Sequence, residues 1–150
     1  ENHNAVITRA KGDIVKMMQQ DDYFAHGFAL EKIVEAMGDK PWLISTNLHF
    51  DGEKEGYPHV PEWNDELYKG KNTLGSVSCL SLRKNTLLFN DELKWMIDVD
   101  LYWRLYQIYG PPVLCADPGV VVRWHMGQQT NLLTEEEKEK EYQLMLKKYA

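Results

Sequence analysis

The chain has 150 residues, of which 43% are hydrophobic and 27% are charged, and its formal net charge is −6 at pH 7. This composition is typical of one globular domain with a core, so it excludes a disordered chain. The negative net charge argues against a broad nucleic-acid-binding face, which needs clustered Lys and Arg. No apolar run approaches the length of about 18 residues that a transmembrane helix needs.

The two cysteines, Cys79 and Cys115, belong to no CxxC motif or Cys/His cluster, so structural zinc is not expected. We predict that both are buried free thiols, as in a reducing compartment. The sequence opens with ENHNAV, without an initiator Met or a signal peptide. We therefore expect a cytoplasmic protein, with the membrane surface as a second location, and a true start upstream of the first residue.

The first third of the sequence alternates between helix and strand patterns. Residues 4–10 (NAVITRA) are predicted as a short helix with Asn4 as its cap, and residues 13–18 (DIVKMM) as a buried strand. From Asp22 the pattern is helical, and a second strand begins with PWLIST at residues 41–46. The apolar stripe expected on this helix consists of Leu30, Ile33, Val34 and Met37.

Residues 47–72 differ from the rest of the chain. They are polar, contain Pro58 and Pro61, and carry several His, Tyr and Trp side chains. A loop of this length in a compact domain is usually functional or disordered. We interpret the region as a long functional loop, because aromatic side chains are unusual in disordered segments.

The second half adds two strand regions and two helices. Residues 73–84 are predicted as a strand, and residues 89–95 (FNDELKW) as a short helix or turn. A helix is expected to start at Asp98, and residues 112–125 to form two short strands broken by Asp117-Pro118-Gly119. The inner face expected for this helix consists of Leu101, Leu105, Ile108 and Tyr109.

The last helix is predicted from capping-box spacing. Thr134 and Glu137 stand three residues apart, and the acidic run that follows is interpreted as a solvated flank. Its apolar face is expected to consist of Tyr142, Met145, Leu146 and Tyr149. Strands alternate with helices throughout, which predicts a single α/β domain over residues 1–150, with a layered mixed sheet and flanking helices.

Three stretches in this order resemble the family 2 glycosyltransferases of the GT-A fold: residues 10–22, 75–105 and 120–130. In that family the first ends in an Asp-x-Asp-Asp-like signature, the second leads to an acidic helix start, and the third is a closing Arg-x-His. The matching residues are Ala10, Gly12, Asp13, Asp21, Asp22, Gly75, Ser76, Arg83, Phe89, Glu92, Trp95, Asp98, Asp100, Leu101, Arg104, Arg123, His125, Gln128 and Thr130.

The sequence departs from the family pattern at three points. Gln19 stands where the signature has its first Asp, and Ile97 stands where an acid is expected before Asp98. The strands that hold the nucleoside base in the family are also missing from the front of this sequence. We therefore expect a GT-A-like domain that lacks its N-terminal nucleoside-binding strands.

The resemblance implies an inverting transfer of a sugar from a nucleotide-diphosphate sugar to an acceptor hydroxyl, assisted by Mg²⁺ or Mn²⁺. It implies Asp21 and His125 as metal ligands and Asp98 as the catalytic base. The acceptor would be a glycan or a lipid-linked molecule, and residues 47–72 would lie on its side of the site. The substrate-binding residues would be Gln20, Asp22, Gly75, Ser76, Trp95, Asp100, Arg123 and Gln128.

Each of these residues also has a structural interpretation. Asp22 and Asp98 are suited to capping helices that begin beside them, and His125 and Trp95 to packing. A non-catalytic module that binds a glycan or a partner is therefore the alternative function. If the N-terminal strands are missing, the strand that they would pair with is an exposed edge, which would favour self-association. A nucleotidyltransferase is a remote rival, because the sequence has no Gly-rich basic phosphate loop.

Overall fold

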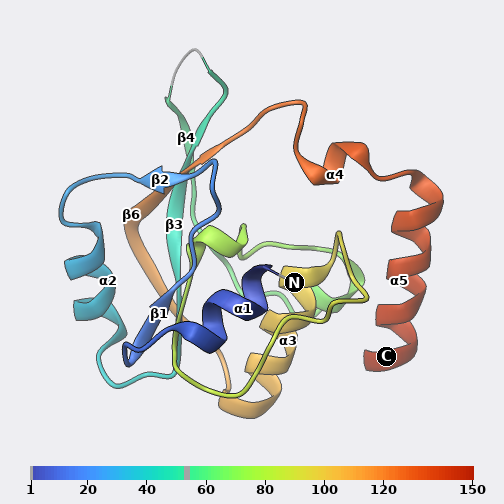
Figure 1. Cartoon of the computed structure of the whole chain (residues 1–150), viewed down its shortest axis with the longest axis horizontal. Coiled ribbons are helices and arrows are strands. Elements are labelled where there is room, and N and C mark those ends of the chain that lie inside the picture. The colour runs from blue at the N-terminus through green and yellow to red at the C-terminus, as the bar shows by residue number, and fades with distance from the viewer. Residues whose placement is uncertain (1, 53–54) are drawn as a thin grey trace.

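The computed structural model describes residues 2–52 and 55–150. A six-stranded sheet runs in the order β1-β5-β3-β6-β2, and β4 pairs with β3 outside this path (Figure 1). The strands are β1 Ile14–Lys16, β2 Tyr23–Phe24, β3 Trp42–Phe50, β4 Glu55–His59, β5 Leu80–Arg83 and β6 Val113–Arg123. The pairing of β3 with β6 is parallel and the other pairings are antiparallel, so the mixed sheet that the sequence predicts is confirmed.

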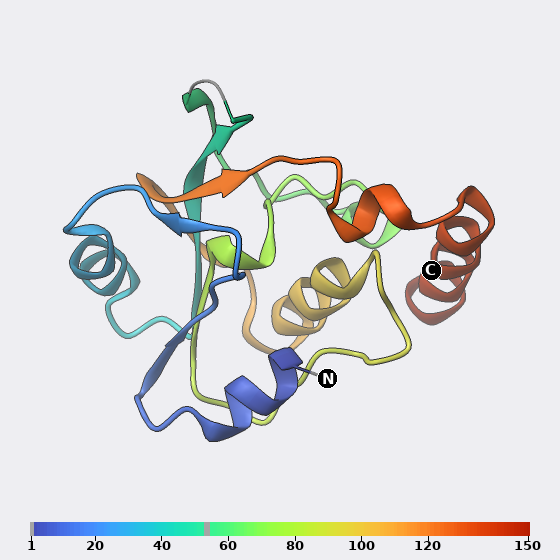
Figure 2. The same ribbon diagram turned by 45° about the horizontal axis from the view of Figure 1, so that its top comes forward.

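Helices cover both faces of the sheet (Figures 1 and 2). The α-helices are α1 Asn2–Arg9, α2 Ala29–Met37, α3 Ile97–Tyr109, α4 Gln129–Leu132 and α5 Glu135–Tyr149, and the 3-10 turns are η1 Leu67–Lys69 and η2 Val77–Cys79. Helix α2 lies on one face, and α1 and α3 lie on the other, with α5 beyond α3. None of the helices in the described residues is long and apolar enough to span a bilayer.

Successive side chains of β3 point to opposite faces of the sheet, so this strand contributes to the core on both faces. Trp42 and Ile44 belong to the main cluster, which also holds side chains of α1, α3 and α5. Leu43 points the other way and packs with Ile33 and Met37 of α2. All three side chains of β3 are 0% exposed, so the central strand carries both layers. Both cysteines are buried and free, as predicted.

The prediction of a long loop at residues 47–72 is wrong. β3 continues through Phe50, and β4 pairs with it as a hairpin in the register Asn47↔His59. Pro58 fits in β4 because, in the described part of the chain, this strand pairs with β3 alone. The remaining residues 60–72 contribute Leu67, which is 0% exposed, to the core, whereas Val60 is 61% exposed.

The structure also corrects the start of the first long helix. Tyr23 and Phe24 pair with β6, so α2 begins at Ala29 and not after Asp22. Its buried positions are Ala29, Ile33 and Met37, which follow each other at intervals of four residues. Two members of the predicted stripe are half exposed instead, namely Leu30 at 48% and Val34 at 51%. Pairing to a neighbouring strand has thus overridden the local helical pattern.

Residues 113–123 are extended, as predicted, but they form one strand and not two short strands broken at Asp117-Pro118-Gly119. β6 runs without interruption, and two register shifts, one on each side of Thr46, leave Ala116, Asp117 and Gly119 without partners in β3, while Pro118 pairs with Thr46. Gly119 permits this close passage, because a Cβ there would lie 2.9 Å from Oγ of Ser45. In the predicted strand at residues 73–84, only β5 is extended, and η2 precedes it.

Two predicted helix starts also differ from the structure. Asn4 lies inside α1, where its amide bonds both backbone groups of Phe89, at 2.9 Å and 2.7 Å. Asp98 lies in the first turn of α3, whose N-cap is Met96. On α3, Leu101 and Leu105 are buried as predicted, whereas Ile108 and Tyr109 are exposed and Tyr102 is buried in their place.

The capping box of α5 is confirmed, and we expect Thr134→Ala to lower the free energy of unfolding by about 1 kcal/mol. The reason is the loss of the bond from the Glu137 amide to Oγ1 of Thr134, which measures 3.2 Å. Urea unfolding of both proteins measures the difference. The exposed Thr86→Ala is the control and should change the value by less than about 0.5 kcal/mol. Equal stability of the two variants would contradict the capping role.

Candidate functional site

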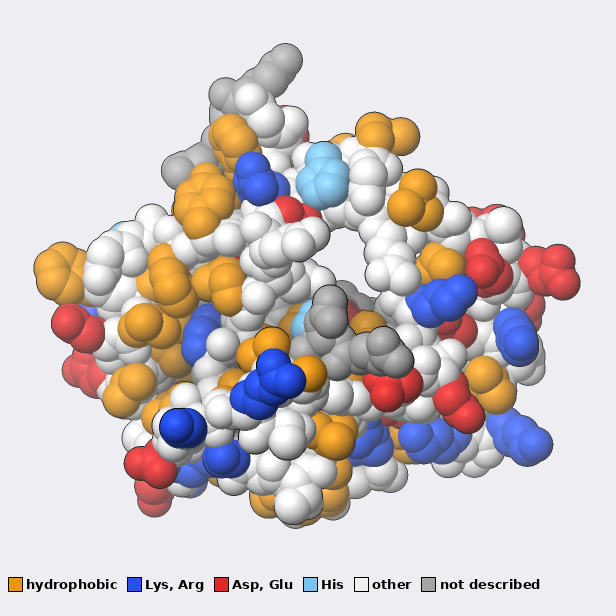
Figure 3. All heavy atoms as spheres, viewed as in Figure 1, with side chains coloured by type: hydrophobic (Ala, Val, Ile, Leu, Met, Phe, Trp, Pro, Cys, Tyr) orange, Lys and Arg blue, Asp and Glu red, His pale blue; other side chains and the backbone are white. Residues whose placement is uncertain are grey.

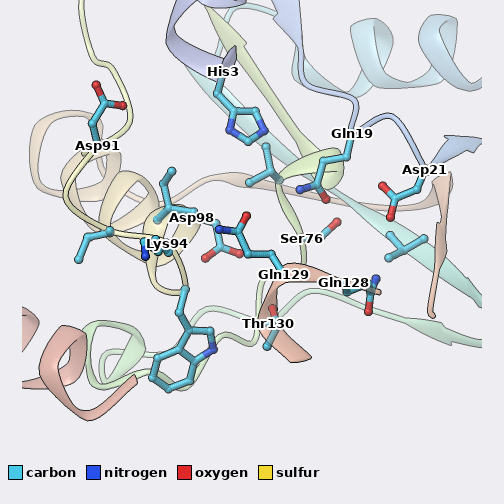
Figure 4. A pocket seen from close by; sticks show the side chains of 15 residues that line it. His3, Gln19, Asp21, Ser76, Asp91, Lys94, Asp98, Gln128, Gln129 and Thr130 are labelled. Carbon is cyan, nitrogen blue, oxygen red and sulfur yellow. The ribbon is translucent and has the colours of Figure 1, made fainter. Parts of the chain in front are cut away.

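A cleft of about 500 Å³ opens where β1, η2, the start of α3 and the segment after β6 approach one another. The face shown in Figure 1 is hollowed near α4 in the space-filling view (Figure 3). Asp21 and Gln19 lie at one end of the cleft and Asp98 at the other, with Ser76 between them (Figure 4). Trp95 and Gln128 also line it. The cleft therefore contains residues from all three stretches that carry the family resemblance.

The end beside Asp21 is built by the chain after β1 and the chain after β6. Oδ2 of Asp21 lies 3.0 Å from Nε2 of His125. The Arg123 side chain donates from Nε to the backbone carbonyl of Asp21, and the Arg123 amide donates to Oδ1 of Asp22 at 3.1 Å. Residues about a hundred positions apart in the sequence are thereby held together, as the resemblance implies.

The Asp21–His125 pair fits a divalent cation in donor type. Oδ2 of Asp21 and Nε2 of His125 lie 3.0 Å apart, which is a direct hydrogen-bond contact, so a cation held by both atoms would replace this bond. A carboxylate oxygen with an imidazole nitrogen suits Mn²⁺ better than Mg²⁺, which prefers oxygen ligands. Among the residues that the structure describes, no group of three or more His, Cys, Asp or Glu side chains is arranged to hold a metal. Substrate oxygens and water would complete the coordination.

Asp22 is neither a helix cap nor a lining residue of the cleft. Its Oδ1 accepts the Arg123 amide, so the side chain fastens the end of β6 to the segment after β1. Burial raises the pKa of Asp22 above its ordinary value. The structure thus gives Asp22 a bond to the Arg123 backbone and does not place it among the residues that line the cleft, and its contact with substrate stays a prediction.

Asp98 forms the opposite end of the cleft. Its Oδ1 accepts the Val99 amide at 2.8 Å, and its Oδ2 accepts Nδ2 of Asn72 at 2.9 Å. Burial raises the pKa of Asp98 from 3.8 to about 6. The carboxylate is thus ionised at neutral pH and yet basic enough to accept a proton, which is the property that general-base catalysis requires.

Asp100 does not contact the cleft, which corrects its predicted role in substrate binding. It is 0% exposed, and its oxygens accept hydrogen bonds from Arg104 at 2.8 Å, Lys148 at 2.8 Å and Tyr149 at 2.6 Å. Burial alone would raise the pKa of Asp100, but the bonds from Lys148 and Tyr149 and the charge of Arg104 hold it below its ordinary value. Asp100 therefore locks α5 against α3.

A second buried carboxylate, which sequence reasoning missed, supports the start of α3. Glu141 is 6% exposed and accepts the backbone amides of Lys94, Trp95 and Met96 at 2.8, 2.9 and 2.9 Å. The acidic run containing Glu141 reads as a solvated flank. Its spacing of four from the buried Met145 was the available signal, because such residues share one helix face.

The other predicted site residues are divided among neighbouring cavities. Gln20 and Arg123 line a hollow beside the cleft, which also contains Asp21, His125 and Gln128. Trp95 lines the cleft and also packs on the main core, so its packing role is confirmed and its contact with substrate stays a prediction. Gly75 has a φ of +101° and lines a further groove on the side of the β3–β4 hairpin.

No protein-family model and no curated protein matches this chain. The structure is a mixed α/β domain whose polar cleft contains Asp98, a carboxylate of raised pKa, and Asp21, which pairs with His125 of the neighbouring hollow. The assignment of a function therefore depends on the chemistry of that cleft.

Proposed function

We propose that this chain is a GT-A-like, family 2-type inverting glycosyltransferase domain, which moves a sugar from a nucleotide-diphosphate sugar to an acceptor hydroxyl. One observation carries the proposal: Asp98, with a pKa of about 6, shares one cleft with the Asp21 carboxylate, which pairs with His125 at 3.0 Å. A base at one end and a cation-binding pair at the other are what this reaction needs.

The acid–imidazole end would bind the donor. Asp21 and His125 would hold Mn²⁺ or Mg²⁺, which when bound supplies neutralisation of the charge that develops on the diphosphate. The guanidinium of Arg123 keeps donors beyond the one bound to Asp21, and these suit phosphate oxygens. Gln20 and Gln128 line the same hollow and can donate to phosphate or sugar oxygens.

Asp98 would activate the acceptor. Its carboxylate takes the proton of the acceptor hydroxyl while the hydroxyl oxygen bonds to the anomeric carbon. The bond from that carbon to the diphosphate breaks, and the diphosphate leaves with the electron pair. Attack from the face opposite the leaving group inverts the anomeric configuration. The bonds from Asn72 and Val99 orient the carboxylate for this step.

We expect Asp21→Ala to weaken binding of Mn²⁺ in the presence of UDP by at least about tenfold, because one of two protein ligands is lost. Electron paramagnetic resonance of free Mn²⁺ measures this affinity, and His125→Ala should behave in the same way. The control is Asp39→Ala, which removes an exposed acid after α2. Unchanged Mn²⁺ affinity in Asp21→Ala would refute the metal role.

A non-catalytic glycan-binding module is the second candidate, and two observations favour it. Gln19 replaces a carboxylate of the family signature, and Asp21 and His125 pair without a third acidic or imidazole ligand among the described residues. Such a module would bind glycans without Mn²⁺ and would release no UDP or GDP from nucleotide sugars. Release of either nucleotide, measured across a panel of UDP- and GDP-sugars with Mn²⁺, favours the enzyme.

A further inference from the structure

A second cavity of about 370 Å³ reaches Asp98 from the side of the β3–β4 hairpin. It shares Ser76, Asp98 and Val122 with the main cleft, so Asp98 lies on the wall of both cavities. We call this cavity the histidine groove. Its polar lining consists of Asn47, His49, His59, Asn72, Ser76 and Asp98.

The lining of the histidine groove suits a neutral ligand rich in hydroxyl groups. Asn, His and Ser side chains both donate and accept hydrogen bonds, as hydroxyl groups do. Within the described residues, no Lys or Arg lines this groove, although Arg123 lines the hollow beside the main cleft. A phosphate group would lack a cation in the groove and would meet the carboxylate of Asp98 instead.

The two histidines contribute polar ring nitrogens to the groove. Nε2 of His59 lies 3.1 Å from the carbonyl oxygen of Thr73, which must accept the bond, so Nε2 carries a proton. The rings of His49 and His59 meet edge-on at 6.3 Å between centroids. Burial, and next the neighbouring His59, lower the pKa of His49, so its imidazole is neutral at pH 7.

The exposed ring of Tyr57 forms an aromatic platform on the β3–β4 hairpin. This ring stacks on that of His49, with centroids 5.4 Å apart, and Tyr57 is 77% exposed. A stacked, exposed ring of this kind presents an apolar face beside polar groups, which matches one face of a pyranose ring. The packing of Tyr57 on His49 holds this platform next to the groove.

Gly75 and Asn72 connect the groove to the base. A Cβ at Gly75 would lie 3.3 Å from Oδ1 of Asn47 and 3.4 Å from Cδ2 of His59, so a larger residue would narrow the groove. Asn72 accepts the Gly75 amide at 3.1 Å and donates to Asp98 at 2.9 Å. The wall of the groove and the orientation of the Asp98 carboxylate thus depend on the same side chain.

We infer that the histidine groove is the acceptor subsite, and that its ligand is an uncharged sugar whose hydroxyl reaches Asp98 from the hairpin side. This inference rests on the proposed function, in which the donor approaches the same carboxylate from the main cleft. The acceptor is thereby assigned to neutral glycans rather than to phosphate-bearing lipids.

Nuclear magnetic resonance of the whole chain tests this inference. Methyl β-D-glucopyranoside, methyl β-D-galactopyranoside and methyl α-D-mannopyranoside are the neutral probes, and glucose 6-phosphate is the charged one. At least one neutral probe should shift the side-chain amide signals of Asn47 and Asn72 and the imidazole signals of His49 and His59. Glucose 6-phosphate should bind at least about tenfold more weakly, because its charge opposes Asp98. Tighter binding of glucose 6-phosphate, or no shift at these four residues, would overturn the inference.

Tyr57→Ala removes the aromatic platform without disturbing the rest of the fold, because the Tyr57 side chain is mostly exposed. The variant should weaken binding of the neutral probe by about fivefold or more and leave Mn²⁺–UDP affinity unchanged. The control is Tyr109→Ala at the far end of α3, which removes a tyrosine that is 41% exposed. Equal probe affinity in the parent and Tyr57→Ala would count against the groove.

The two proposals fail in distinguishable ways. Binding of Mn²⁺–UDP with no glycoside shift in the groove would defeat the acceptor subsite and leave the donor site standing. A glycoside shift in the groove without any binding of UDP or GDP in the presence of Mn²⁺ would support the neutral-sugar groove. That second result would defeat the transferase and favour the glycan-binding module.

Discussion

Asp98→Asn is expected to reduce sugar transfer by about 100- to 10,000-fold, the contribution typical of a general base. The amide cannot accept the proton of the acceptor hydroxyl, while the donor site around Asp21 stays intact. Turnover with Mn²⁺ and the preferred nucleotide sugar measures the loss, and Mn²⁺–UDP affinity should be unchanged. Asp39→Asn is the matched control, because it removes an exposed acid far from the cleft. Near-parental turnover in Asp98→Asn would defeat its assignment as the base.

The pH dependence follows from the same carboxylate. The pKa of Asp98 is raised from 3.8 to about 6, so kcat/KM should rise with pH, reach half its maximum near pH 6 and level off above about pH 7. Because the folded state favours the protonated form, the parent should lose stability relative to Asp98→Asn as the pH rises from about 4 to 6. Titration of activity and of urea midpoints checks both directions. A flat activity profile between pH 5 and 7 would contradict the assignment.

Glu141→Ala is expected to lower the free energy of unfolding by about 3–5 kcal/mol. The change leaves three backbone amides without their acceptor, those of Lys94, Trp95 and Met96, of which the first two are partly buried and the third is buried. Each unsatisfied group costs about 1–3 kcal/mol, and partial entry of water offsets some of the sum. Urea unfolding followed by circular dichroism measures the difference.

Glu136→Ala is the matched control for Glu141, since both are glutamates of α5 and Glu136 is exposed. It should change stability by less than about 0.5 kcal/mol. A similar small effect in Glu141→Ala would show that the start of α3 does not depend on this carboxylate. The hydrogen bonds to Glu141 connect α5 to the candidate site, because Trp95 and Asp98 lie in or next to the segment that Glu141 binds.

Local patterns predicted those elements whose signals are local. The capping box of Thr134 and Glu137 and the apolar strand around Leu43 and Ile44 are examples, because each depends on neighbours within a few residues. The start of α2 was missed because Tyr23 pairs with Val121, about a hundred residues later. The β3–β4 hairpin was missed because its polar residues and Pro58 resemble a loop until β3 pairs with them.

The site was less predictable from periodicity alone. Asp98 and Asp100 are two residues apart, so on a helix their side chains differ by about 200° and cannot serve the same surface. Which of them faces the cleft depends on α5, whose Lys148 and Tyr149 bind Asp100. The pairing of Asp21 with His125 likewise depends on β2, which follows Asp21 and pairs with β6 in the sheet. The family resemblance linked these residues where spacing did not.

Calorimetric titration of UDP and GDP into the chain, with and without Mn²⁺, tests whether the Asp21–His125 pair, whose atoms lie 3.0 Å apart, is a metal–diphosphate site. We expect that one of the two nucleotides binds, that binding requires Mn²⁺, and that Asp21→Ala abolishes it while Asp39→Ala does not. Binding of neither nucleotide with Mn²⁺, or binding that is the same without it, would refute the proposed donor site.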